Sequence, residues 1–427
     1  MTIVWQVPHT IVLRYGLLVL LGLVGWPAAA RGLARPATDV GRRAREPFEM
    51  LLWFIAWSFT VAAFVARVPA ESMNDLRAEW VAPTLVLLLG YGLALRFPER
   101  DAVVRVIFLG FVLHAFMQLV TALYLTARGV PLNFSNFGGI SDHKANVTYT
   151  SALALAMLIA DTVARARGSP GFLRINTPYA LVAFALLACS TVLATTRNGL
   201  VVFALMSLAA VVLVARALSP AASRRGWAAL GACIALVIAG LVVGFKADPR
   251  WSSFRETAPV AWDTDMNRQW LNGERNETDL PVTASGKPVD PSAYYRIAFL
   301  KEGLRIMNEH PLGTRVGRDA FRKAVQDKYG RGGMSHAHNG IVDVGVSLGW
   351  VGVIMWIAFM GSFVVFAARA PDPDGSGLRL ALVLATAAFF MRSLLDATVR
   401  DHIVQEYLLI AGALVGASVM AGSRGRA

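Results

Sequence analysis

The sequence predicts an all-α polytopic integral membrane protein with about eleven or twelve transmembrane helices. Hydrophobic residues make up 56% of the 427-residue chain and charged residues only 16%, which excludes a soluble globular enzyme and a disordered chain. Apolar runs of roughly 20 residues recur along the chain, which is the length that a helix needs to cross the hydrocarbon core. The runs are apolar on every face, as between Leu17 and Leu21, whereas membrane-spanning strands would alternate.

Eleven apolar runs are candidates for these helices. In chain order they lie near 11–30, 47–66, 80–96, 106–126, 146–164, 177–195, 198–217, 227–245, 345–368, 378–397 and 405–422. The first run ends in Pro27-Ala28-Ala29-Ala30, which is similar to the cleavage site of a signal peptide. We interpret it as a membrane helix, because no Lys or Arg precedes Arg14 and an Arg-rich segment follows at 31–45.

Arginine is distributed unevenly between alternate connections, and this asymmetry predicts the orientation. One set of connections, together with the C-terminus, carries Arg31, Arg35, Arg42, Arg43, Arg45, Arg96, Arg100, Arg105, Arg165, Arg167, Arg174, Arg216, Arg224, Arg225, Arg369, Arg379, Arg424 and Arg426. The short connections of the other set carry only Arg67, Arg77, Arg128, Lys144, Arg197 and Arg400. Cytoplasmic loops are enriched in Lys and Arg, so we expect the second set of connections to lie outside, which for the inner membrane of a Gram-negative bacterium is the periplasm. This topology explains the formal net charge of +13 without nucleic acid as a partner.

The one long connection divides the chain into three parts. We expect N-terminal transmembrane helices over 1–245, a large periplasmic loop with the candidate catalytic segment over 246–338, and C-terminal transmembrane helices over 339–427. Between 294 and 309 apolar residues recur at helical spacing, at Ile297, Leu300, Leu304 and Met307. Charged residues occupy the other faces, at Arg296, Lys301, Glu302 and Arg305. This pattern predicts an amphipathic helix against the membrane or the bundle, ended by the segment His310 to Gly313.

A histidine lies where the long loop re-enters the membrane. In the segment from Ser335 to Gly340, His338 is our candidate for a general base, because a histidine titrates near neutral pH and can accept a proton from a hydroxyl. The alternative is a solvated interfacial histidine without a chemical role. Gly349 and Gly352 follow His338 and Asn339 in the spacing H-N-x9-G-x-x-G, and this pattern favours the functional interpretation.

The H-N-x9-G-x-x-G pattern resembles the signature of the O-antigen ligases, a family that shares a membrane superfamily with the O-antigen polymerases and the protein O-oligosaccharyltransferases. The stretch from Thr195 to Gly199 resembles the family's Thr-x-Arg turn, and the stretch from Arg296 to Phe321 resembles its Arg-rich periplasmic segment. The resemblance begins at about residue 138, and the first hundred residues match only in hydropathy.

The resemblance implies a fold similar to that of C-type glycosyltransferases and a role in lipopolysaccharide biosynthesis. The implied reaction moves a polysaccharide from undecaprenyl diphosphate to a sugar hydroxyl of lipid A–core oligosaccharide on the periplasmic side. The implied partners are therefore the undecaprenyl diphosphate-linked O-antigen donor, the lipid A–core acceptor and membrane lipids. Attack by an acceptor hydroxyl opposite the leaving diphosphate would invert the anomeric configuration.

Arginines on the predicted outer face suit a diphosphate leaving group, because guanidinium stays charged and donates in a planar fork. Arg197 lies in a short turn between two apolar helices, where an unpaired charge is costly; the alternative is a side chain that only snorkels to the interface. Arg296 is our second candidate catalytic residue, although arginines on amphipathic helices also meet anionic headgroups. Arg315 and Arg318 lie in a glycine-containing turn. They are candidate diphosphate contacts, and the alternative is that they belong to a solvated basic loop.

Four further polar residues complete the candidate set. Lys144, before the fifth run, and Asn339, next to His338, are expected to contact the sugar or diphosphate, although charge anchoring also explains Lys144. Arg392 and Asp396 are four residues apart within the tenth run, and we interpret them as a structural ion pair. No recognised metal-ligand spacing or nucleotide-binding glycine pattern is present, so we expect a metal-independent site without a cofactor.

Other functions remain open from sequence alone. An O-antigen polymerase or a protein O-oligosaccharyltransferase would use the same donor, and only the resemblance selects the acceptor. A transporter of lipid-linked glycan or anions is the alternative from another class, although no inverted repeat is visible. The two cysteines, Cys189 and Cys233, fall in apolar runs, which excludes a disulfide framework.

Overall fold

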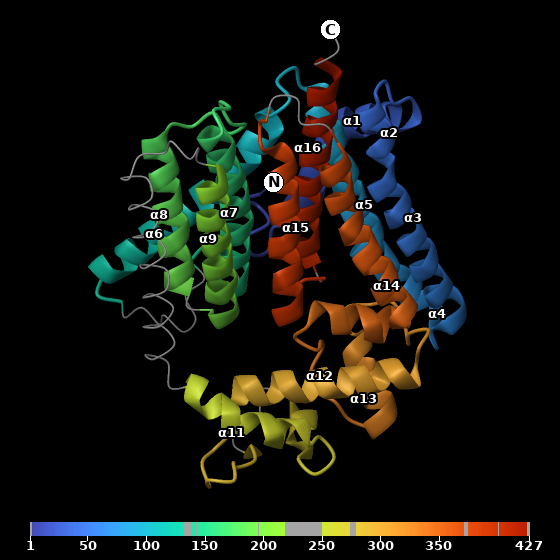
Figure 1. Ribbon diagram of the computed structural model, residues 1–427. Helices are drawn as coiled ribbons and strands as arrows, with labels where there is room; N and C mark the ends of the chain where they lie inside the picture. The colour runs from blue at the N-terminus through green and yellow to red at the C-terminus, as the bar shows by residue number, and fades with distance from the viewer. Residues whose placement is uncertain are drawn as a thin grey trace.

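A computed structural model gives the fold of the chain, which is a bundle of long helices with a helical layer across one end (Figure 1). The structure describes residues 2–130, 139–141, 143–194, 196–217, 250–273, 279–370, 375–399 and 401–424. Within these ranges there is no strand. The predicted all-α polytopic membrane protein is confirmed, because the described residues contain ten helices long and apolar enough to cross a membrane.

Ten of the eleven predicted runs match these candidate spans. The spans are α1 (Ile11–Ala34), α2 with α3 and η1 (Asp39–Val65), α4 with η2 and α5 (Pro69–Arg96), α6 (Ala102–Ala127), α7 (Lys144–Ala166), α8 (Thr177–Ala194), α9 (Arg197–Ala217), α14 (Gly340–Arg369), α15 (Leu378–Leu395) and His402–Gly422 of α16 (Asp401–Arg424). The predicted run near 227–245 lies outside the described residues.

The third span begins earlier than the hydropathy of the sequence predicts. We expected a helix from about residue 80, but α4 (Pro69–Leu76), the π-helical η2 (Arg77–Val81) and α5 (Ala82–Arg96) follow one another without a break. The first part is rich in polar residues, which conceals it from a hydropathy search. It is helical because Pro69 is suited to a first turn and because Leu76 and Trp80 pack into the core.

Glycines allow α1, α5 and α16 to cross closely. A Cβ atom at Gly92 would overlap the backbone of Gly25, and one at Gly412 would overlap the carbonyl of Leu87. Small residues of this kind let helix backbones approach in membrane proteins, where van der Waals packing replaces the hydrophobic driving force. These three helices therefore form a tightly packed flank of the bundle.

A layer of helices lies across the end of the bundle, here called the α12 end (Figure 1). It consists of α11 (Arg250–Trp262), the 3-10 turn η3 (Arg268–Asn272), α12 (Pro291–Glu309) and α13 (Ala320–Tyr329). The predicted helix over 294–309 is thus present as α12, and it lies against the bundle, since Gly303 faces Val342 and Gly345 faces Met307 of the α12–α14 contact.

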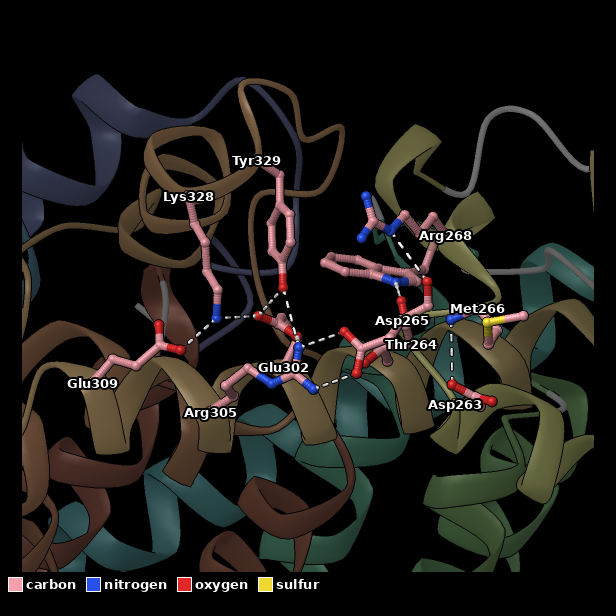
Figure 2. A network of polar contacts seen from close by, with 11 residues as sticks. Asp263, Thr264, Asp265, Met266, Arg268, Glu302, Arg305, Glu309, Lys328 and Tyr329 are labelled. Atoms are coloured by element: carbon pink, nitrogen blue, oxygen red, sulfur yellow. Dashed lines mark hydrogen bonds and ion pairs between the residues drawn. The ribbon is translucent and has the colours of Figure 1, made fainter.

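One residue of α12 does not lie where the sequence pattern placed it. We expected Glu302 on a polar face, but its side chain is fully buried. Tyr329 donates a hydrogen bond of 2.7 Å to its carboxylate, and Lys328 and Arg305 lie 3.0 and 3.4 Å away (Figure 2). A carboxylate can be buried when charged donors surround it, and these donors come from α13 and from the next turn of α12.

Candidate functional site

The C-terminal end of α15 is the point where the predicted site residues meet. The last carbonyls of a helix have no partner within it, and here side chains from three other segments supply the donors. The carbonyl of Leu395 accepts from Asn198 Nδ2 at 2.6 Å and from Arg296 Nη1 at 3.3 Å. The carbonyl of Leu394 accepts from Asn339 Nδ2 at 3.0 Å. Segments that are nearly 200 residues apart in the chain are thereby brought to one helix end.

Arg197 is the first residue of α9 and connects that helix to the layer at the α12 end. Its Nη2 lies 3.3 Å from Oδ2 of Asp290. Asp290 caps α12 by accepting from the Ala293 amide at 2.8 Å, and Asp290 is itself buried. A capping aspartate is stabilised both by the free amides and by the positive end of the helix dipole, so it holds the Arg197 guanidinium at the start of α12. One-fifth of the Arg197 side chain remains exposed.

Arg296 reaches the same place from the second turn of α12. Its neighbours on the buried side of that helix are aromatic, with Tyr294, Tyr295 and Phe299 all buried. Tyr294 and Tyr295 donate to the carbonyls of Asn267 and Gly273 at 2.8 Å each. The rigid anchoring of α12 to the 263–273 segment fixes the direction in which the guanidinium projects.

His338 lies just before α14 in a left-handed backbone conformation with φ of 53°. Its Nδ1 is 3.8 Å from Oδ1 of Asp396, and 12% of its side chain is exposed. The ring of Phe299 is nearly parallel to the imidazole, with centroids 6.2 Å apart, and the ring of His336 is 4.2 Å away. A carboxylate next to an imidazole orients the ring and stabilises its protonated form, so this arrangement suits a base.

Asp396 joins the histidine to a buried arginine. Burial raises the pKa of the Asp396 carboxyl, but the charges of Arg392 and Arg296 and the neighbouring His338 outweigh burial and hold the pKa below its ordinary value. The predicted pair of Arg392 and Asp396 is present, with Nη2 and Oδ2 2.8 Å apart. Within the described part of the chain, Nη1 of buried Arg392 has no hydrogen-bond partner, and a buried donor of this kind calls for an acceptor.

Asp396 and Asp290 are functional candidates that the sequence did not identify as such. The charge of Asp396 inside an apolar run was the available signal, because intramembrane charges mark functional sites. Asp290 precedes Pro291, which signals a helix start but not an ion pair with Arg197. Phe299 carries no signal in the sequence, since buried aromatic residues are ordinary core.

Asn339 also lies at the end of α15, whereas Arg315 and Arg318 have different surroundings. Asn339 caps α14, accepting from the amides of Ile341 and Val342 at 3.0 and 3.1 Å. Arg315 lies 3.2 Å from Glu71 and 3.4 Å from Asp75 of α4. Arg318 lines a cavity between α1, α4 and α16.

Lys144 begins α7. Two residues later Asn146 lies 3.2 Å from Nε2 of His402, at the start of α16. Lys144 therefore marks the end of α7 that lies beside α16.

The glycines of the H-N-x9-G-x-x-G pattern have a packing role. Gly349 interrupts α14 with φ of 71°, a conformation that glycine adopts without strain. A Cβ atom there would overlap the carbonyl of Pro311, and the Trp350 amide donates to that carbonyl at 3.0 Å. The pattern thus fixes the turn after α12 against α14. Among the described residues no group of three His, Cys, Asp or Glu side chains is placed to hold a metal ion.

The fold and this arrangement define a polytopic membrane protein with a polar, arginine-rich site at one end of its helix bundle. Residues 182–357 match the family model described as O-antigen ligase. Over this segment the protein is thus similar to the O-antigen ligase family, as the sequence predicted, and the match supports a function of the ligase and polymerase type. The matched segment contains Arg197, Arg296 and His338 and ends before Asp396. A comparison with curated proteins gave no match.

Proposed function

We propose that the protein is an O-antigen ligase, which transfers O-antigen polysaccharide from undecaprenyl diphosphate to a sugar hydroxyl of lipid A–core oligosaccharide. The observation that carries the proposal is the meeting of Arg296, His338 and Asn198 at the end of α15, with Arg197 next to Asn198 in the chain and paired with the Asp290 cap of α12. Membership of the family supports a lipid-linked polysaccharide as donor and lipid A–core as acceptor in general terms.

Arg197 and Arg296 take the donor diphosphate in this proposal. Both guanidinium groups are partly exposed at the α12 end, and each is oriented by a contact with the protein. Arg392 is buried, and its Nη1 has no hydrogen-bond partner among the described residues. Positive groups preorganised where negative charge develops are commonly the largest contribution to catalysis. The arginines neutralise the diphosphate as the glycosidic bond to the sugar breaks.

His338 is the general base of the proposed reaction, and Asp396 is its positioning residue. The imidazole removes the proton from the acceptor hydroxyl while the hydroxyl oxygen attacks the anomeric carbon and undecaprenyl diphosphate leaves with the bonding electron pair. Attack from the face opposite the leaving group inverts the configuration. Asp396 remains ionised and stabilises the imidazolium that forms.

The proposed location is the bacterial inner membrane with the α12 end in the periplasm. The arginine asymmetry supports this orientation, because Arg31, Arg45 and Arg369 lie at the other end of the bundle. A periplasmic site suits a donor that is linked to lipid rather than to a nucleotide.

Reconstitution of the purified protein with undecaprenyl diphosphate-linked glycan tests the proposal. We expect transfer to lipid A–core, with inverted configuration and in excess chelator, and no transfer to a pilin-type protein or to the end of another glycan chain. The loss of a positioned base costs roughly 10² to 10⁴ in rate, so His338→Ala should abolish most transfer without releasing the donor.

Arg197 gives the second arm of this test. Arg197→Lys keeps the charge and loses the planar fork, so transfer should fall substantially, and it should nearly vanish in Arg197→Ala. Lys323→Ala on α13 is the matched control, because that exposed cation lies on a helix that packs mainly against α14. Full turnover by Arg197→Ala, or product of retained configuration, would contradict the proposal.

A further inference from the structure

A cavity of about 240 Å³ lies beside the candidate site, between the start of α1, the α4–η2 segment and the start of α16. Its polar walls are Arg14, Asp75, Glu79, Arg318, His402 and Gln405. Trp5 and Tyr15 add two aromatic side chains. None of these residues takes part in the reaction described above, so the cavity is a separate feature of the α12 end.

The cavity opens toward the lipid-facing surface of the bundle. Ile11 and Tyr15 of α1 line it and are 61% and 45% exposed. α1 is a candidate membrane span, and exposed apolar residues on such a helix contact lipid. Leu18, one turn further along, is buried and closes the cavity. A molecule that enters here from the membrane therefore has a lipid part outside and a headgroup inside.

The lining selects a particular headgroup chemistry. Arg14 is held in place by hydrogen bonds to the carbonyls of Val4 and Val7 and to the Thr10 hydroxyl, at 3.3, 2.9 and 3.0 Å. Preordered guanidinium groups suit phosphate oxygens. Two carboxylates share the same wall; they repel a bare diphosphate and accept hydrogen bonds from hydroxyl groups. Cations, carboxylates, an amide and aromatic rings together suit a sugar that carries phosphate.

The cavity leads toward the segment that carries His338. A second void of about 20 Å³ shares Glu79 and Arg318 with it and is lined also by Asp343 and Val399. Oδ1 of Asp343 accepts from the amide of Ala337 at 2.7 Å, directly before His338. The cavity therefore lies next to the segment that carries the base.

We infer that this cavity receives the phosphorylated sugar headgroup of the acceptor glycolipid, which enters sideways from the membrane between α1 and α4. The inference rests on the proposed function, and it assigns Arg318 to the acceptor rather than to the donor diphosphate. The acceptor then reaches His338 from the α1–α4 side of the site.

Binding of lipid A–core to the purified full-length protein in nanodiscs tests the inference without turnover. Arg318→Ala removes a charged wall, and Ala78→Phe places a ring in the opening. We expect both to weaken binding of lipid A–core by at least about tenfold, the loss of one charge-assisted hydrogen bond. Arg322→Ala is the control, because Arg322 pairs with Asp319 on α13 and does not line the cavity. Dephosphorylated lipid A–core should bind the wild type as weakly as the intact molecule binds Arg318→Ala.

Three results would overturn the inference. The first is wild-type affinity for lipid A–core in both variants. The second is that the variants lose binding of undecaprenyl diphosphate-linked glycan while they still bind lipid A–core. The third is equal binding of phosphatidylglycerol, which would make the cavity a site for bulk lipid. Steady-state kinetics separate this inference from the proposed function: Arg318→Ala should raise the acceptor KM and leave the donor KM unchanged. A wild type that binds lipid A–core without transferring glycan to it would contradict the proposed function alone.

Discussion

His338 adopts a backbone conformation that costs a non-glycine residue on the order of 1–3 kcal/mol. The residues on both sides hold it there. The Ala337 amide is bound by Asp343, and Asn339 caps α14 while donating to the end of α15. Strained residues of this kind persist where the surrounding structure determines them fully. The imidazole is therefore aimed by the backbone before any substrate arrives.

The pH dependence of transfer should separate His338 from Asp396. The lowered pKa of Asp396 means that its carboxylate is fully formed above its ordinary range and is lost only as the pH falls through the lower, folded-state value. An acid limb of the rate profile above that value then belongs to a group other than Asp396, which the proposal takes to be the base His338. In Asp396→Asn this limb should move to lower pH, because the carboxylate that favours the imidazolium is gone. A limb that stays in place while kcat falls would mean that Asp396 only supports the fold.

At the scale of elements, α12 is fixed to the rest of its layer by an ion cluster around the buried Glu302 (Figure 2). Arg305 binds both oxygens of Asp265 at 2.9 and 2.8 Å. These hydrogen bonds from Arg305 lower the pKa of Asp265 to about 2. Lys328 of α13 bridges Glu302 and Glu309 at 3.0 and 2.7 Å. The cluster thus holds Arg296, two turns away on the same helix, in register with α15.

Replacing Glu302 should loosen this layer. Removing one partner of a buried ion cluster costs on the order of 3 kcal/mol, so Glu302→Gln should lower the thermal unfolding midpoint in detergent and weaken transfer through misplacement of Arg296. Glu309→Gln, at an exposed position of the same cluster, should cost no more than about 1 kcal/mol. Equal midpoints for the two variants would mean that the burial of Glu302 has no energetic consequence.

The long apolar elements and the chemistry of single residues were predictable from the sequence, whereas the pairings were not. Hydropathy marks α6 or α9 because each must cross lipid by itself, and arginine and histidine carry their chemistry wherever they lie. Arg197 meets Asp290 across 93 residues of chain. No periodicity encodes such a contact, and the same holds for His338 with Asp396. The polar start at Pro69 was missed because tertiary packing, not apolar composition, makes it helical.

At the scale of the whole molecule, the layer and the opposite end of the bundle should lie on different sides of the membrane. Ala284 is exposed in the layer and Arg167 is exposed between α7 and α8. In a background with Cys189 and Cys233 replaced by serine, Ala284→Cys should react with an impermeant thiol reagent in intact spheroplasts, and Arg167→Cys should react only after lysis. The reverse pattern would place the site in the cytoplasm and remove its access to a periplasmic acceptor.

The end of α15, which receives donors from α9, α12 and the segment before α14, has a consequence for how the protein is made. Chains emerge from the ribosome N-terminus first, so Arg197, Arg296 and His338 are all synthesised before Leu395 exists. Until that carbonyl and Asp396 have been inserted, Arg296, His338 and Asn198, the neighbour of Arg197, lack the contacts that set their spacing. Under the proposed function, we therefore expect the protein to become active only late in its biosynthesis and a nascent chain that stalls before α15 to be inactive.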